Sequence, residues 1–168
     1  IKYGIAAMAL LVLMLLGISN NNSSKYYIYP KEGALEIWKG RFSPKDKQFF
    51  MVLHGVQLDQ EVKTVYSRSD VYPMIFDYHL EKADTLLEVP GLPDFEGIKG
   101  YLYQARSYAI TPETKNKVKG RLNSIERMIL LYKADVAVSK NSEDSLKAAL
   151  KDLQKASGLV ANPTQQQE

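Results

Sequence analysis

The sequence predicts a mainly helical α+β protein with an N-terminal transmembrane helix, a small β-hairpin layer and a body of about four antiparallel amphipathic helices. Three observations support this prediction. Residues 1–19 are largely apolar, residues 26–66 contain aromatic and β-branched runs, and apolar positions recur at helical spacing over residues 69–160. Residues 20–25 are interpreted as a polar spacer after the anchor, and residues 161–168 as a polar tail.

The N-terminal segment is predicted to cross a membrane. No charged residue lies between Lys2 and Lys25, and a helix of that length would reach roughly 33 Å, compared with about 30 Å for a hydrocarbon core. The strictly apolar part, residues 5–18, is shorter. It also fits the hydrophobic region of an uncleaved signal peptide, or a helix buried in a globular domain, so these alternatives stay open.

We expect the lipid bilayer to be a partner and the folded domain to lie on the extracytoplasmic side, either periplasmic or extracellular. A hydrophobic segment with a short leading tail usually acts as a signal anchor in a single-pass protein. The basic residues that follow it, Lys25, Lys31, Lys39 and Arg41, would instead favour a cytoplasmic domain. The sequence contains no cysteine, which fits either side of a membrane.

The β layer is predicted to begin with a hairpin. Residues 26–29 and 34–38 are rich in aromatic and branched side chains, and the Pro-Lys-Glu-Gly segment at 30–33 is typical of a turn. Residues 48–53 form a third apolar run, although Ser43 followed by Pro44 would also start a helix. Another short strand is expected at 62–66. Two strands alone are marginal in water, so this layer needs the helices or a partner.

Aromatic side chains are most concentrated in and just after this hairpin. Such a cluster either packs a core or forms a surface for a protein, a glycan or lipid headgroups. Two further tyrosines lie on the apolar side of the second predicted helix. The predicted interaction residues are therefore Tyr27, Tyr29, Trp38, Phe42, Tyr101 and Tyr108.

The first helix of the body is predicted to start at Ser69-Asp70 and to end before Pro90. At about 100° per residue, its acidic residues fall on one face and its apolar residues on the other. His79 lies on the apolar side, so it does not share a face with Asp77 and Glu81. It is expected to be a histidine buried with a hydrogen-bond partner, not a metal ligand or an acid–base residue.

Three more helices are predicted from their start signals: Asp94, Thr111 before Pro112, and Ser142. The third helix carries apolar residues at spacings of 3, 4 and 7 from Val118 to Val136, and we expect it to be the most buried helix. Short connections require consecutive helices to alternate in direction.

The charges of these helices are uneven. Residues 77–96 carry six acidic residues and one lysine, whereas residues 112–140 carry seven basic and three acidic residues. This alternation indicates faces that complement each other within the fold or between copies.

The segment Ile98-Lys-Gly100-Tyr101, followed by Ala105, is similar to the Leu-x-Gly-plus-aromatic pattern of tetratricopeptide repeats. The period does not match, because helix starts at 70 and 111 are about 41 residues apart and the repeat has about 34. The second pair of helices also lacks the motif. We therefore describe the body as a helical hairpin array like that of tetratricopeptide repeats, without assigning the chain to that family.

No pattern that specifies a reaction is present. The sequence has no nucleophile elbow, no Gly-rich phosphate loop, no paired cysteines, and no His–carboxylate spacing on one helix face. We expect no enzyme activity, no cofactor and no bound metal. The net charge of +3 is too small to indicate a nucleic-acid partner.

These observations predict a membrane-anchored, non-catalytic accessory or scaffold subunit. Its helical body and aromatic hairpin would dock onto other subunits of a membrane protein assembly, onto copies of itself, or onto both. The alternative is a membrane-tethered binding module for a glycan or a small ligand, using the aromatic cluster and a groove between helices.

Overall fold

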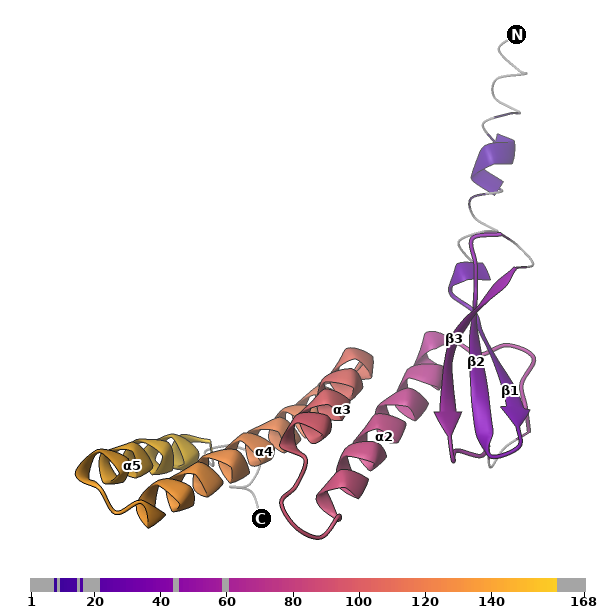
Figure 1. The fold of residues 1–168 in the computed structure, drawn as a ribbon. Coiled ribbons are helices and arrows are strands. Elements are labelled where there is room, and N and C mark those ends of the chain that lie inside the picture. The colour runs from indigo at the N-terminus through magenta and orange to yellow at the C-terminus, as the bar shows by residue number, and fades with distance from the viewer. Residues whose placement is uncertain are drawn as a thin grey trace. The chain divides into compact units, whose positions relative to one another are not determined.

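The computed structural model describes residue 8, residues 10–14, residue 16 and residues 22–43, 46–58 and 61–159. The chain divides into two compact units, unit 1 (Ile1–Ile75) and unit 2 (Phe76–Glu168). The division falls inside helix α2 (Arg68–Leu87), so the first turns of this helix belong to unit 1 and the rest to unit 2 (Figure 1).

The predicted transmembrane anchor over residues 1–19 is contradicted. Within the described part of the chain, no helix has both the length and the apolar character needed to cross a bilayer. A crossing helix needs about 20 apolar residues. The described residues of this segment, 10–14 together with 8 and 16, are helical and exposed, and the others lie outside the described residues. The single-pass, signal-anchor and membrane assignments, and the extracytoplasmic location that followed from them, are therefore withdrawn.

Unit 1 contains a three-stranded antiparallel sheet in the order β1 (Tyr26–Lys31), β2 (Ala34–Gly40) and β3 (Lys47–His54) (Figure 1). The predicted hairpin is confirmed, with Tyr27 opposite Trp38, and Gly33 takes a positive φ of 71° in the turn that connects the two strands. Residues 47–54 form a strand, so the alternative helix there is wrong. The strand expected at 62–66 is reduced to a single bridge between Tyr66 and Tyr26.

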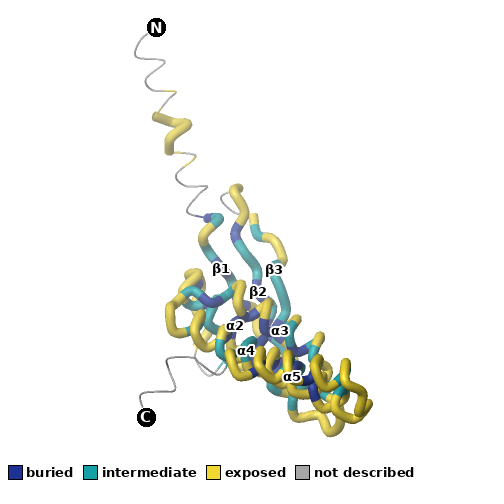
Figure 2. Tube along the Cα trace, turned by 90° about the vertical axis from the view of Figure 1, so that its left-hand side faces the viewer, coloured by how far each residue is buried: buried dark blue, intermediate teal, exposed yellow. Residues whose placement is uncertain are grey.

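One face of this sheet is buried, because alternate residues of a strand point to the same side. Ile28 pairs with Ile37 and Leu35 pairs with Leu53, and these four side chains are at most 3% exposed. Tyr26 lies on the same face, with its ring edge-on to Phe50 and to Tyr72 at centroid distances of 5.7 and 6.1 Å. Val71 and Ile75, in the turns of α2 that belong to unit 1, are fully buried as well. Buried and less buried positions alternate at the start of β1 and along most of β2, whereas β3 is mostly intermediate or exposed (Figure 2).

Asn22 is a buried polar residue of unit 1, although the sequence places it in a spacer. Its side-chain amide lies 2.9, 2.7 and 3.2 Å from the carbonyl oxygens of Arg41, Ser43 and Asp46. These carbonyls belong to the connection between β2 and β3. The backbone amides of Asp46 and Arg41 also donate to the carbonyls of Ser43 and Asp46, so the buried amide adds to the hydrogen bonds that fix this connection.

Unit 2 is helical and contains α2 from Phe76 onward, α3 (Phe95–Tyr108), α4 (Pro112–Ser139) and α5 (Glu143–Gly158). The predicted caps Asp94, Thr111 and Ser142 are confirmed, and Thr111 and Ser142 form capping boxes. The start of α2 differs from the prediction. Its capping pair is Ser67 and Asp70: the Asp70 amide donates to Ser67 Oγ at 3.2 Å, and the Ser67 amide donates to Asp70 Oδ2 at 2.8 Å. The Ser67 hydroxyl also donates to Asp70 Oδ2, and this hydrogen bond, together with the one from the Ser67 amide, lowers the pKa of Asp70.

The core of unit 2 joins α2, α3 and the first half of α4. The second half of α4 packs against α5, with Leu130 and Ala134 buried on α4 and Ala149 and Ala156 buried on α5. The prediction that α4 would be the most buried helix is wrong for this second half, because Met128, Leu131, Tyr132 and Val136 are 38–47% exposed. The members of the first core are Phe76, Leu80, Ala83, Ile98, Leu102, Ala105, Ala109, Val118 and Ile125.

Candidate interaction surfaces

The face of the sheet opposite the buried one is aromatic. Strand alternation and the pairings of Tyr27 with Trp38, Tyr29 with Glu36 and Trp38 with Phe49 place these side chains together on that face. We call it the aromatic face, and its members are Tyr27, Tyr29, Glu36, Trp38, Lys47 and Phe49. Tyr29 is 42% and Phe49 is 54% exposed, and Tyr27 and Trp38 are half-buried.

The polar ends of the two tyrosines are already engaged. Lys47 donates a hydrogen bond to the Tyr29 hydroxyl at 2.7 Å, and its ammonium lies over the ring of Tyr27, 3.7 Å from the ring centroid. The Tyr27 hydroxyl donates to Oδ1 of Asn22 at 3.3 Å. The buried asparagine therefore fixes one tyrosine of the aromatic face as well as the connection between β2 and β3.

The indole of Trp38 is held in the same way. Its Nε1–H donates to Oε2 of Glu36 at 3.2 Å, and its ring meets Phe49 edge-on at 5.8 Å. Glu36 also pairs with Lys31 at 2.6 Å. The hydrogen bonds from Lys31 and Trp38 lower the pKa of Glu36, which keeps it ionised. What Trp38 and Phe49 offer to a partner is their ring surface.

The structure brings together only part of the predicted interaction set. Tyr27, Tyr29 and Trp38 share the aromatic face, and Phe42 is 62% exposed in the connection that follows β2. Their role in binding remains a prediction. Phe49 and Lys47 were not predicted. Alternation along the third apolar run would place Phe49 on the same face as Met51 and the buried Leu53. The register shift beside Trp38 pairs Phe49 with Trp38 on the opposite face, and the sequence did not indicate this shift.

Tyr101 and Tyr108 belong to unit 2 and pack inside it. Their ring centroids lie 6.1 and 5.9 Å from that of His79, and Tyr78 lies edge-on to the same imidazole at 5.3 Å. Both tyrosines are half-buried. They pack around His79.

His79 is 7% exposed, as the sequence predicts for its side of the helix. Neither of its ring nitrogens has a hydrogen-bond partner among the described residues, so the prediction of a bonded histidine is wrong in that respect. Burial lowers the pKa of His79, so the imidazole is neutral at pH 7. The part of the chain that the structure describes contains no group of three or more His, Cys, Asp or Glu residues that could hold a metal ion.

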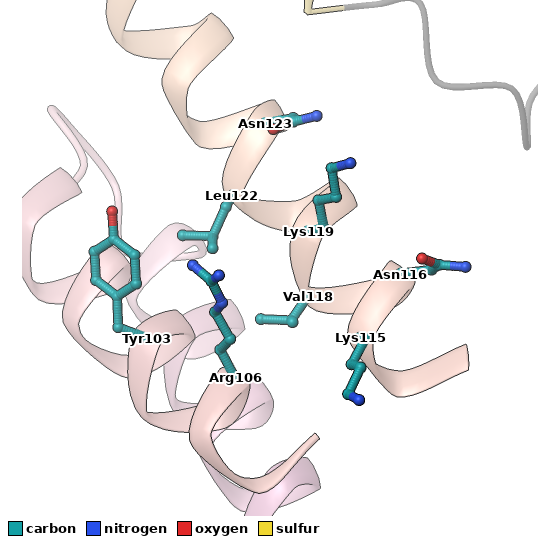
Figure 3. A pocket seen from close by; sticks show the side chains of 8 residues that line it. All are labelled: Tyr103, Arg106, Lys115, Asn116, Val118, Lys119, Leu122 and Asn123. Atoms are coloured by element: carbon teal, nitrogen blue, oxygen red, sulfur yellow. The ribbon is translucent and has the colours of Figure 1, made fainter. Parts of the chain in front are cut away.

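A hollow of about 500 Å³ lies along α3 and α4. Its apolar floor includes Val118 and Leu122, and Figure 3 shows Arg106 extending from α3 between Tyr103 and Leu122. Lys119, Asn116 and Asn123 also line the hollow, but they point away from Tyr103 on the other side of α4 (Figure 3). Its polar groups therefore do not converge on one point, as the groups of a small-molecule site commonly do.

A second hollow, of about 460 Å³, lies between α2 and α4 and is lined by both signs of charge. Asp84 meets Arg121 there through two contacts, Nη1 to Oδ1 at 2.9 Å and Nη2 to Oδ2 at 3.1 Å. Asp77, Glu81 and Glu88 lie on the same wall as Asp84. The acidic and basic segments predicted to complement each other thus meet, at least at this pair, within the fold.

Comparisons with known proteins found no match: no family model fits the chain, and neither a curated protein nor a solved structure is significantly similar to it.

Proposed function

We propose that this chain is a non-catalytic adaptor or scaffold subunit that docks onto another protein through its aromatic face. The observation that carries the proposal is the exposure of aromatic rings on one sheet face while the opposite face of the same sheet is buried. Exposed aromatic residues held in fixed positions are typical anchors of protein interfaces.

The contacts of the aromatic face favour a protein over a glycan. A glycan platform combines a ring with free polar groups that bind sugar hydroxyls. Here the Tyr29 hydroxyl accepts from Lys47, the Trp38 indole N–H donates to Glu36, and the Tyr27 hydroxyl donates to Asn22. The remaining ring surface suits apolar side chains, and the fixed rotamers reduce the entropy that binding costs.

Co-purification from the cells that produce the protein tests the proposal. We expect a tagged full chain to retain a specific partner, and the substitution Phe49→Ser, which removes one of the most exposed rings, to reduce recovery of that partner at least tenfold. Leu92→Ser is the matched control, because Leu92 is 65% exposed in the connection between α2 and α3, outside the aromatic face. Recovery of the same proteins with both variants, or a lone chain without co-purifying protein, would contradict the proposal.

The alternative function is a binding module for a glycan, whose sugar rings would stack on the exposed rings of the aromatic face. The chain has one tryptophan, and it lies in the aromatic face, so its fluorescence reports on that surface. The adaptor predicts no change in Trp38 emission when polysaccharide or cell-wall fragments are added. A saturable change would favour the glycan module.

A further inference from the structure

Strand β3 lies at one edge of the sheet and has fewer buried residues than β1 or β2 (Figure 1). Its residues 49–53 are five apolar residues in succession, yet only Leu53 among them is buried. Phe49 is 54% exposed and Val52 is half-buried. An edge strand also presents a row of backbone N–H and C=O groups, which a further strand can satisfy.

The hydrogen bonds at the start of β1 show which backbone groups of β3 face outward. The amide and the carbonyl of Tyr26 both bond to Tyr66, at 2.9 Å each, on the side away from β2. Backbone groups of successive residues point to opposite edges of a strand. By this alternation, the residues of β2 that face β3 are Leu35, Ile37 and Lys39, and their partners on β3 are Leu53, Met51 and Gln48. The Gly55 amide donates to the Gly33 carbonyl at 2.7 Å, in agreement with this order.

The outward positions of β3 are Lys47, Phe49, Val52 and His54. Their partners on β2 are two residues apart in turn, so the outward positions are evenly spaced in spite of the extra residue Phe50 at the register shift. The Lys47 amide donates to Oδ1 of Asp46 at 2.9 Å. Among the described residues, the outward backbone groups of Phe49 and Val52 make no hydrogen bond. The centre of β3 therefore offers the donors and acceptors of an open sheet edge.

The opposite edge of the sheet is largely closed in the described part of the chain. Tyr66 occupies the outward groups of Tyr26, and Pro30 has no N–H to donate. Ile28 is the outward residue that remains between them. A sheet with one open edge pairs with a second copy through the same strand of both copies. Such a contact is isologous, so it closes at two chains and does not continue into a fibre.

We propose that β3 pairs with β3 of a second copy, antiparallel about a two-fold axis, so that the two sheets form one continuous sheet. The register that overlaps the whole strand places Phe49 opposite Val52 of the second copy. Phe49 and Val52 pair with Trp38 and Glu36 within the sheet, so both point to the aromatic face. A cross-strand pair of an aromatic and a β-branched side chain on one face is favourable.

The same register separates like charges. Lys47 is the only residue of β3 that is charged at pH 7, and it lies opposite His54 of the second copy, at the far end of the strand from the second Lys47. Because the two-fold axis is perpendicular to the sheet, the aromatic faces of the two copies lie on the same side. The pairing uses the backbone of β3, whereas the adaptor function uses exposed rings. Either proposal can therefore fail while the other holds.

Sedimentation equilibrium of the full chain tests the association. We expect a concentration-dependent dimer, and we expect Val52→Lys to raise its dissociation constant at least tenfold, because the charge would lie beside Phe49 of the second copy. Val65→Lys is the matched control, since Val65 is 39% exposed and precedes Tyr66 at the closed edge. Unchanged Trp38 emission shows that both variants keep the sheet. A chain that is monomeric at all concentrations, or a dimer that Val52→Lys leaves intact, would overturn the proposal.

Amide hydrogen exchange of the unmodified chain tests the pairing without any substitution. The amides of Phe49 and Val52 should exchange at least tenfold more slowly above the dissociation constant than well below it, because they donate across the interface only in the dimer. The Ile28 amide faces outward at the other edge and is the control, with the same exchange rate at both concentrations. Constant exchange at Phe49 and Val52 in a chain that dimerises would show that the copies meet elsewhere, and would refute the pairing.

Discussion

Gly40 at the end of β2 lies against the backbone carbonyl of Asn22. A Cβ atom on Gly40 would overlap the carbonyl oxygen and lie 2.9 Å from the carbonyl carbon. The Gly40 amide also donates to the carbonyl of Lys25 at 2.9 Å, so the strand cannot move away without losing this bond. The close approach, and not an unusual φ, explains the glycine at this position.

The substitution Gly40→Ala is therefore expected to destabilise the sheet. Because backbone atoms would have to shift, we expect a loss of about 1–3 kcal/mol in the free energy of unfolding. Urea unfolding followed by Trp38 fluorescence measures it, since Trp38 lies in the same strand. Gly100→Ala is the control: a Cβ there meets nothing within 4 Å, and alanine in a helix should be neutral or stabilising by about 0.5–1 kcal/mol. Equal effects of the two substitutions would contradict this account.

Asn22→Leu tests the role of the buried amide. Leucine has a similar size but removes the amide that donates to the carbonyls of Arg41, Ser43 and Asp46, and only the last two keep a second donor, the backbone amides of Asp46 and Arg41 respectively. We expect a loss of about 1–3 kcal/mol in the same urea experiment. Asn116→Leu removes an amide from an exposed position of α4 and should change stability by less than about 0.5 kcal/mol. If Asn22→Leu is equally harmless, water replaces the amide and the connection between β2 and β3 does not depend on it.

His79 should make stability depend on pH in a narrow window. Burial lowers its pKa in the folded state, whereas the unfolded chain keeps the ordinary value of about 6.5. As the pH falls below about 6.5, the unfolded state binds the proton first, so the free energy of unfolding decreases until the pH reaches the folded pKa. The pKa values of Glu36 and Asp70 are also lowered, but from ordinary values of 4.5 and 3.8, so their effect comes at lower pH.

Urea unfolding monitored by circular dichroism between about pH 7 and pH 5 measures this dependence. The variant His79→Phe should lose it, since a phenyl ring fits among Tyr78, Tyr101 and Tyr108 and does not titrate. His54 is the only other histidine and lies exposed at the end of β3, so His54→Gln should keep the dependence of the unmodified chain. A slope that persists in His79→Phe would assign the effect to other groups.

Local signals in the sequence were enough for the hairpin and for most helix starts. Turns and helix caps depend on contacts between residues only a few positions apart, so the local sequence is enough to predict them. This holds for the turn at Gly33 and for the caps Asp94, Thr111 and Ser142. The anchor was the main error. A run of apolar residues shows hydrophobicity, but a crossing helix also requires length, and no described helix combines the two.

The surfaces could be predicted only in part, because they depend on contacts between distant residues. Asn22 looks like part of a polar linker, and its partners lie 19 to 24 positions further along the chain. The apolar positions of α5 predict a face, but not that Ala149 meets α4 while Leu150 remains exposed. The sequence was enough to predict an aromatic cluster of Tyr27, Tyr29 and Trp38. It did not show on which face of the sheet the cluster lies, because that depends on the burial of Ile28 and Ile37 on the opposite face.

The pair of Asp84 and Arg121 should contribute a small but measurable coupling between α2 and α4. Its two parallel contacts give the fork geometry that favours arginine over lysine, but the side chains are 40% and 46% exposed, so solvent screens the attraction. A double-mutant cycle with Asp84→Asn and Arg121→Gln should give about 0.3–1 kcal/mol at low salt and less in 1 M salt. The Glu143–Lys147 pair, which lies within α5, should couple by about 0.3–0.5 kcal/mol. A coupling of zero for Asp84 and Arg121 would mean that apolar packing alone holds these two helices, and that the alternating charges of the sequence serve only the surface.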